Sequence, residues 1–208
     1  MTAPSLPARI RRRATTAGLA LSGKQIEDLA AYCVLLERWN RRMNLTALPL
    51  RDFPDPTLDR LLLEPLGAAR YLGEVPPCCW LDLGSGGGSP AIPIKLARPG
   101  LRLTMVESRS RKAAFLREVV RSLELNDAEV FEGRIESLSE GWTGLVDLLT
   151  VRAVRADAAL LGTSSEILRR GGRLLLFSEP PSGVGSLRHR ETYELPGTAS
   201  RLQVLEKV

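Results

Sequence analysis

The spacing of apolar residues divides the chain into a helical first third and a longer region where strands and helices alternate. Apolar side chains recur at helical spacing before residue 73, as in Ile26, Leu29, Cys33 and Leu36. Ser22 and Gln25 form a capping-box pattern that predicts the start of the second helix. We expect three helices here, over residues 7–21, 22–43 and 57–72.

Short apolar runs separated by helical patterns follow from residue 79 onward. They predict strands over residues 79–83, 102–106, 128–131, 146–151 and 173–177. The intervening segments predict helices over residues 90–97, 109–123 and 157–169, with a turn near 135–138. Such alternation is typical of an α/β fold with a mostly parallel, doubly wound sheet.

The last part of the chain completes this expected sheet. Two later runs, at residues 191–195 and 201–208, predict strands at an antiparallel edge, which makes seven strands in all. The segment 179–185, rich in Pro and Gly, is expected to be a flexible or lid-like loop. We therefore predict a Rossmann-like fold with a helical extension over residues 1–73 and an α/β core over residues 74–208.

Composition narrows the class of protein. The chain has 208 residues, 44% of them hydrophobic, and lacks an apolar run long enough to span a bilayer. Its three cysteines, Cys33, Cys78 and Cys79, have neither the spacing of a zinc site nor that of a disulfide framework. We expect a cytoplasmic protein with reduced thiols, no metal site and no membrane contact, and we expect a monomer.

The net charge of +5 is concentrated near the N-terminus. Residues 1–42 contain eight Lys or Arg and three Asp or Glu, a difference of five that equals the whole excess. Such an asymmetry favours contact with a polyanion, although a solvated helix face would give the same pattern.

A glycine-rich turn follows the first predicted strand. It has the pattern Gly84-x-Gly86-x-Gly88, and an acidic residue, Glu107, ends the next strand 23 residues after Gly84. Glycines allow close approach of the backbone to a ligand, and a carboxylate at this place accepts hydrogen bonds from a ribose diol. The turn and the acid therefore predict a ligand with an adenosine-like end.

The surroundings of the turn select among such ligands. A phosphate-binding P-loop needs a Lys after the last glycine, and a dinucleotide site needs a third glycine where Ser89 stands. Neither requirement is met, and S-adenosylmethionine fits better. Glu107 would bind its ribose, and the backbone near residues 134–136 would flank its adenine.

The motifs together resemble the RsmG (GidB) family of bacterial 16S ribosomal RNA methyltransferases, which make 7-methylguanine. The resemblance covers nearly the whole chain. It is carried by residues 39–47 (Trp-Asn-x-x-Met-Asn-Leu-Thr-Ala), 82–93 (from Asp-Leu-Gly-Ser-Gly to Pro-x-Ile-Pro), 111–117, 134–136 and 151–153. It implies a class I methyltransferase fold, S-adenosylmethionine as cofactor, and 16S ribosomal RNA or the small ribosomal subunit as partner.

The resemblance also implies site residues. The expected cofactor-binding residues are Gly84, Gly86, Ser89, Glu107, Ile135, Glu136 and Arg152. Four residues are expected to contact the substrate: Arg41, Arg42, Asn44 and Thr46.

Three places depart from the family pattern. Residues 60–65 read Arg-Leu-Leu-Leu-Glu-Pro where the family usually has Arg-His-x-x-Asp-Ser. Ser89 replaces a large apolar residue, and Ser178-Glu179 replaces Lys-Gly. The last change reverses a charge at the expected RNA-facing rim, so it bears on RNA recognition more than on cofactor binding.

The chemistry of guanine N7 agrees with the scarcity of candidate bases. The N7 lone pair is free, so methyl transfer to it needs positioning more than proton removal. The only histidine, His189, lies in the late part of the chain and is expected to have a surface or packing role. We assign no catalytic residue.

Other interpretations of individual residues remain open at this point. Arg152 would otherwise form a salt bridge with Asp82 or Glu107, and Asp82 would order the glycine turn or meet the cofactor's ammonium. Asn44 and Thr46 would otherwise be turn-forming residues. At the level of function, the alternatives are a cofactor-binding but catalytically weak RNA-binding or ribosome-assembly protein, and a small-molecule methyltransferase.

Overall fold

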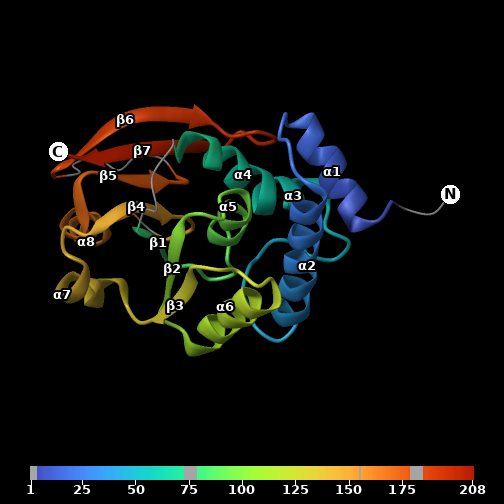
Figure 1. Ribbon diagram of the computed structural model, residues 1–208, viewed down its shortest axis with the longest axis horizontal. Coiled ribbons are helices and arrows are strands. Elements are labelled where there is room, and N and C mark those ends of the chain that lie inside the picture. Colours follow the sequence, from blue (N-terminus) through green and yellow to red (C-terminus); the bar gives the residue numbers. More distant parts are fainter. Residues whose placement is uncertain (1–3, 73–78, 155, 179–184) are drawn as a thin grey trace.

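A seven-stranded sheet, mostly parallel, organises the fold (Figure 1). The computed structural model describes residues 4–72, 79–154, 156–178 and 185–208. The strands are β1 (Cys79–Leu83), β2 (Arg102–Glu107), β3 (Ala128–Glu132), β4 (Val146–Val151), β5 (Leu168–Leu176), β6 (Leu187–Glu194) and β7 (Arg201–Lys207). The expected α/β fold is confirmed.

The order of strands places the ligand crevice. The sheet runs β3-β2-β1-β4-β5-β7-β6, with β7 antiparallel to both β5 and β6 and the other pairs parallel. The chain leaves β1 toward β2 and β3 and then returns to β4 on the other side of β1. In open α/β sheets, ligands bind at the carboxyl ends of the strands where the order reverses in this way.

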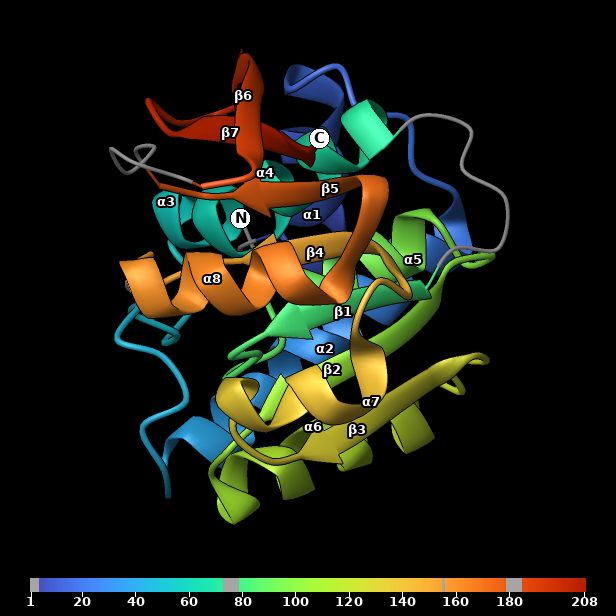
Figure 2. The ribbon, with the colours of Figure 1, turned by 90° about the vertical axis from the view of Figure 1, so that its left-hand side faces the viewer.

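Helices cover both faces of the sheet (Figures 1 and 2). They are α1 (Leu6–Thr16), α2 (Gly23–Asn40), α3 (Asp55–Leu58), α4 (Glu64–Ala68), α5 (Ala91–Ala97), α6 (Ser110–Ser122), α7 (Ser139–Trp142) and α8 (Ala158–Ile167). A π-helical turn spans Asp59–Leu63, and 3₁₀ turns span Ala69–Leu72 and Ile135–Leu138. The predicted capping box of α2 is present.

Alternating residues of β1 separate two apolar cores. Trp80 belongs to a core shared with the N-terminal helices, α5 and α6, whereas Leu81 faces a second core that includes residues of α8. This follows from the period of two along a strand. The helical extension therefore buries its apolar face on the sheet, and α2 also packs against α5 and α6. The division between an extension and a core near residue 73 stays a prediction, since residues 73–78 lie outside the described residues.

Several element bounds differ from expectation. Three helices end earlier than expected: α1 at Thr16, α2 at Asn40 and α8 at Ile167. The strand β5 begins directly after α8, at Leu168. The pairing of β5 with β4 shifts between Val146 and Leu148, so residues 169–172 form a bulge before the regular strand. Because the bulge contains two adjacent glycines, the sequence pattern did not predict the early start of β5. The strand β6 begins at residue 187 instead of 191.

Pro65 explains why the expected helix over residues 57–72 is not uniform. Proline has no N–H, so it cannot donate the hydrogen bond that an α-helix would send to the Leu61 carbonyl. The backbone widens into the π-helical turn just before it, where Glu64 N–H donates to the Asp59 carbonyl. The lid-like loop expected at residues 179–185 lies outside the described residues except for Gly185. Among the helices of the described residues, none has both the length and the apolar character needed to cross a membrane.

Candidate functional site

The glycine turn lies at the carboxyl end of β1. Gly84 and Ser85 both donate their N–H groups to the Val106 carbonyl, at 2.9 and 3.0 Å, which ties the turn to β2. Gly84, Gly86 and Gly88 all have positive φ, a region that side chains disfavour. A Cβ at Gly84 would also lie 2.5 Å from the Val154 side chain. The turn thus requires glycine for conformation and for space.

The last two glycines of the turn leave little room for a Cβ. A Cβ at Gly88 would lie 2.9 Å from Ile92 Cγ1, and one at Gly87 would lie 3.3 Å from Leu36 Cδ1. Tyr32 of α2 donates its hydroxyl to the Gly87 carbonyl at 2.6 Å, and its burial raises the pKa of this phenol well above the usual value. The turn is therefore packed directly against α2.

Glu107 ends β2 beside the turn and is nearly buried. One carboxylate oxygen accepts the Gly86 N–H at 2.9 Å, and the other accepts the Arg109 N–H at 2.9 Å. Each oxygen has a second lone pair for a further donor. Glu107 can therefore hold the turn and still accept hydrogen bonds from a ligand, as expected for a ribose-binding acid.

Two cavities meet at Gly84. The larger, of about 420 Å³, lies between the glycine turn, the segment after α2 and the carboxyl end of β4. Its lining comprises Leu36, Leu45, Thr46, Ala47, Leu48, Arg60, Leu61, Gly84, Ser85, Gly86, Gly87, Ser89, Lys112, Arg152 and Ala153. The smaller, of about 220 Å³, is lined by Gly84, Val106, Glu107, Ser108, Gly133, Arg134, Ile135 and Glu136. We call these the turn cavity and the acid cavity.

All seven residues expected at the cofactor site line one of the two cavities. Gly86, Ser89 and Arg152 line the turn cavity, Glu107, Ile135 and Glu136 line the acid cavity, and Gly84 lines both. Because the cavities adjoin at a residue without a side chain, one elongated ligand can extend through both.

A buried carboxylate lies on β1, two residues before the glycine turn. Asp82 of β1 accepts a hydrogen bond from the Thr150 hydroxyl, which in turn accepts the indole N–H of Trp80 at 3.0 Å. The second carboxylate oxygen of Asp82 is buried and has no hydrogen-bond partner among the described residues. Burial raises the pKa of Asp82 to about 6, against the lowering effects of the Thr150 hydroxyl and the Arg152 charge. An unpaired buried carboxylate oxygen of this kind suits a cationic ligand group.

Arg152 follows β4 and pairs with Glu64, an acid distant in the sequence. Its guanidinium lies 2.6 Å from Glu64 Oε2, so the ion pair is not with Asp82 or Glu107. It also donates to the Ser89 hydroxyl at 3.0 Å and lies over the Phe177 ring, 5.5 Å from its centroid. Burial lowers the pKa of Arg152 and the Glu64 charge raises it, but a guanidinium stays protonated.

The expected substrate residues do not all reach the turn cavity. Thr46 lines it, and its hydroxyl accepts the Leu48 N–H at 3.2 Å, so it is also a turn-forming residue. Asn44 and Arg42 are exposed outside the lining. Arg41 is exposed as well and pairs with Glu37 at 2.9 Å.

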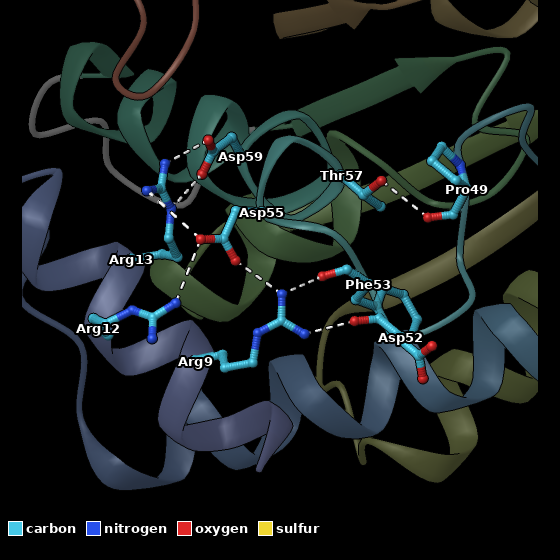
Figure 3. Close-up of polar contacts among 9 residues, drawn as sticks. All are labelled: Arg9, Arg12, Arg13, Pro49, Asp52, Phe53, Asp55, Thr57 and Asp59. Atoms are coloured by element: carbon cyan, nitrogen blue, oxygen red, sulfur yellow. Dashed lines mark hydrogen bonds and ion pairs between the residues drawn. The ribbon is translucent and has the colours of Figure 1, made fainter. Parts of the chain in front are cut away.

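The arginines of α1 fasten this helix to the segment around α3 (Figure 3). Arg13 donates to both carboxylate oxygens of the buried Asp59, at 2.9 and 2.5 Å. Arg9 donates to the carbonyls of residues 52 and 53 and pairs with Asp55 at 2.8 Å. Arg12 pairs with Asp55 at 3.4 Å and stays more than half exposed. Three of the four arginines of this helix therefore pair with carboxylates of the same chain.

Comparison with known proteins assigns the chain to a family. The family model described as "GidB: rRNA small subunit methyltransferase G" matches residues 25–180. The chain belongs to this family. A relative named ribosomal RNA small subunit methyltransferase G, from Stenotrophomonas maltophilia (strain K279a), is 39% identical over 180 residues, covering 86% of this chain and 78% of the relative. One of the same name from Xanthomonas axonopodis pv. citri (strain 306) is 40% identical over 168 residues, covering 81% and 73%.

Solved structures show the same fold at low sequence identity. A SAM-dependent methyltransferase from Aquifex aeolicus superposes with a TM-score of 0.57 at 15% identity, covering 74% of this chain and 97% of that one. The structure described as MtNAS in complex with MTA and tNA gives 0.60 at 16% identity, covering 96% and 81%. These neighbours agree with the class I methyltransferase fold expected for a member of the rRNA small subunit methyltransferase G family.

Sequence reasoning missed residues that join the N-terminal segment to the site. Asn40, at the end of α2, accepts the N–H groups of Leu45 and Thr46 at 2.8 and 3.0 Å and so shapes one wall of the turn cavity. The occurrence of Asn40 in the family motif Trp39-Asn40 was the sequence feature that could have indicated this role. Glu64 was noticed only as part of a departure from the rRNA small subunit methyltransferase G pattern, because a residue 88 positions before Arg152 gives no local sign of pairing with it.

Proposed function

We propose that this protein transfers a methyl group from S-adenosylmethionine to N7 of a guanine in 16S ribosomal RNA. The observation that carries the proposal is the meeting of two cavities at Gly84, one with the Glu107 carboxylate and the other with the Arg152 guanidinium, in a chain that belongs to a ribosomal RNA methyltransferase family.

The residues present fit the cofactor. Glu107 has lone pairs for the ribose hydroxyls, and Ile135 and Glu136 line the acid cavity where an adenine would lie. In the turn cavity, the cationic Arg152 matches the carboxylate of an amino-acid group. When bound, S-adenosylmethionine supplies an electrophilic methyl carbon attached to a sulfonium.

The protein's own contribution is positioning and exclusion of water. Five apolar residues on the lining of the turn cavity belong to the segments around α2 and α4: Leu36, Leu45, Ala47, Leu48 and Leu61. A dry, preorganised site of this kind favours an in-line displacement by a nucleophile that needs no deprotonation. Guanine N7 is such a nucleophile. The only histidine, His189, lies on β6 and interacts with Thr192 and Gln203, so it is not part of either cavity.

Cations at or near the cavities support RNA as the substrate. Arg60 and Lys112 line the turn cavity, Arg134 lines the acid cavity, and Arg42 follows α2. None of these four forms an ion pair among the described residues, in contrast to Arg9 and Arg13 of α1. We call these four residues the basic rim and infer that it, and not α1, binds RNA phosphates.

The proposal is tested by methyl incorporation. Small subunits from cells that lack the protein would be incubated with labelled S-adenosylmethionine and wild type, Glu107→Ala or His189→Ala. We expect wild type and His189→Ala to label 16S ribosomal RNA equally at guanine N7, and Glu107→Ala to be slower by about 100-fold or more. Label at another atom, or equal labelling by Glu107→Ala, would contradict the assignment.

The choice of RNA over a small substrate has its own readout. RNA affinity measured against salt concentration should fall steeply for wild type, with a slope that decreases by about one for Lys112→Ala or Arg42→Ala. Affinity insensitive to salt would point to the small-molecule alternative. RNA and cofactor binding without turnover would point to an assembly role. We further propose a monomer acting in the cytoplasm, and light scattering on purified protein would check the first point.

A further inference from the structure

The guanidinium of Arg152 is shared between two partners from distant parts of the chain. One nitrogen bonds Glu64 Oε2 at 2.6 Å, and another bonds the Ser89 hydroxyl at 3.0 Å. The side chains of Arg152 and Glu64 are only 8% and 2% exposed. The other carboxylate oxygen of Glu64 is buried without a hydrogen-bond partner among the described residues. The pair is therefore monodentate although a bidentate fork is the usual arrangement of Arg with a carboxylate.

Ser89 is what keeps the pair monodentate. Its hydroxyl donates its single proton to the Leu61 carbonyl at 2.8 Å, which fixes the lone pairs that accept from Arg152. The Leu61 carbonyl is open to this donor because Pro65 cannot supply the N–H that an α-helix would place there. Two departures from the family pattern, Pro65 and Ser89, are thus structurally linked in this chain.

The arrangement leaves part of the guanidinium available to a ligand. A guanidinium has five N–H donors, and the contacts with Glu64 and Ser89 use two of them. Arg152 lines the turn cavity and interacts electrostatically with Asp82, whose free oxygen has the opposite charge. The free donors of Arg152 match the carboxylate of an amino-acid group.

We propose that Glu64 and Ser89 are positioning residues that hold the Arg152 guanidinium toward the carboxylate of the cofactor's amino-acid end. The proposal rests on the proposed function, since it assumes S-adenosylmethionine in these cavities. Without the Ser89 hydroxyl, the guanidinium is free to rotate onto both oxygens of Glu64, which turns its donors away from the cavity.

Two ligands separate this role from a merely structural one. S-adenosylhomocysteine carries the amino-acid end, and 5′-methylthioadenosine lacks it while keeping the adenosine. Calorimetry with both ligands on wild type and Ser89→Ala should show S-adenosylhomocysteine binding weakened roughly tenfold and methylthioadenosine binding unchanged within about twofold. A loss of packing or of fold would weaken both ligands alike.

A matched control lies outside both cavities. Thr57 donates its buried hydroxyl to the Pro49 carbonyl at 2.9 Å and lines neither cavity. Thr57→Val therefore removes a similar bond, and it should lower the melting temperature without changing the ratio of the two affinities. Ser89→Thr retains the hydroxyl and should retain the ratio, and Glu64→Gln should shift it in the same direction as Ser89→Ala.

The outcomes distinguish the two levels of the argument. If wild type binds neither ligand, the proposed function fails. If wild type binds both, and Ser89→Ala and Glu64→Gln weaken both equally or neither, the positioning role is wrong while the cofactor assignment stands. Should Ser89→Ala not fold, Glu64→Gln still decides the question, because it keeps a side chain of similar size in place.

Discussion

Asp82 gives the sharpest test of the electrostatics next to the glycine turn. Its pKa is raised from 3.8 to about 6 because the carboxylate is buried. Between these two values the folded protein retains a proton that the unfolded chain has released. The free energy of unfolding must therefore fall as pH rises through this window, with the penalty fully present above about pH 6.

The size of the effect follows from the shift. A change from 3.8 to about 6 corresponds to about 3 kcal/mol, because one pKa unit equals about 1.4 kcal/mol. Asparagine has the shape of the protonated acid and cannot ionise. Asp82→Asn should therefore match wild type near pH 4 and exceed it in stability by up to about 3 kcal/mol near pH 7.

Urea unfolding of both proteins at several pH values from 4 to 7.5 would measure this difference. Subtracting one curve from the other removes groups that titrate in both proteins, such as Asp55, whose pKa is lowered by its hydrogen bond with Arg9 and which acts in the opposite direction. A difference that stays flat with pH would refute the assignment of an ionised, poorly compensated Asp82. A rise of S-adenosylhomocysteine affinity from pH 5 to 7 in wild type alone would place the ligand's ammonium beside it.

Three further substitutions test the glycine turn, the first helix, and the link between Pro65 and Ser89. Gly84→Ala should abolish cofactor binding and lower the melting temperature, as calorimetry and thermal scans would show, because the position has φ of 72° and no room for a Cβ. Arg13→Ala should lower the free energy of unfolding in urea by about 2 kcal/mol, because it leaves a buried aspartate unpaired. Arg12→Ala should change this free energy by less than about 0.5 kcal/mol, and equal losses would contradict the observed contacts. Pro65→Ala restores a helical N–H, so Ser89→Ala should destabilise less in that background; additive melting shifts would exclude the link.

The sequence predicted the parts of the molecule that depend on local pattern. Alternation of strands and helices specified the sheet and its antiparallel edge, and the turn at Gly84 with its acid at Glu107 lies where the two cavities share their lining. These signals are local because a strand, a glycine turn and a helix start each follow from a few neighbouring residues.

The rest depended on contacts between distant segments. Tyr32 and Asn40 are ordinary members of a helix in sequence, and only the fold brings them to the glycine turn and the wall of the cavity. The charge count near the N-terminus favoured a polyanion partner, but it does not show that Asp55 and Asp59 lie opposite the arginines of α1. A charge count gives the number of basic residues in a segment. Only the fold shows how many of them are paired with acidic residues of the same chain.

The packing of Gly87 and Gly88 against α2 has a consequence for anyone who wishes to shorten or recombine this enzyme. A fragment starting at β1 would keep every glycine of the turn. It would lose Tyr32 and Leu36 of α2, which contact the turn. It would also uncover the apolar side of the sheet around Trp80. The glycine turn therefore cannot be moved into another protein by itself, because a working graft would have to include α2.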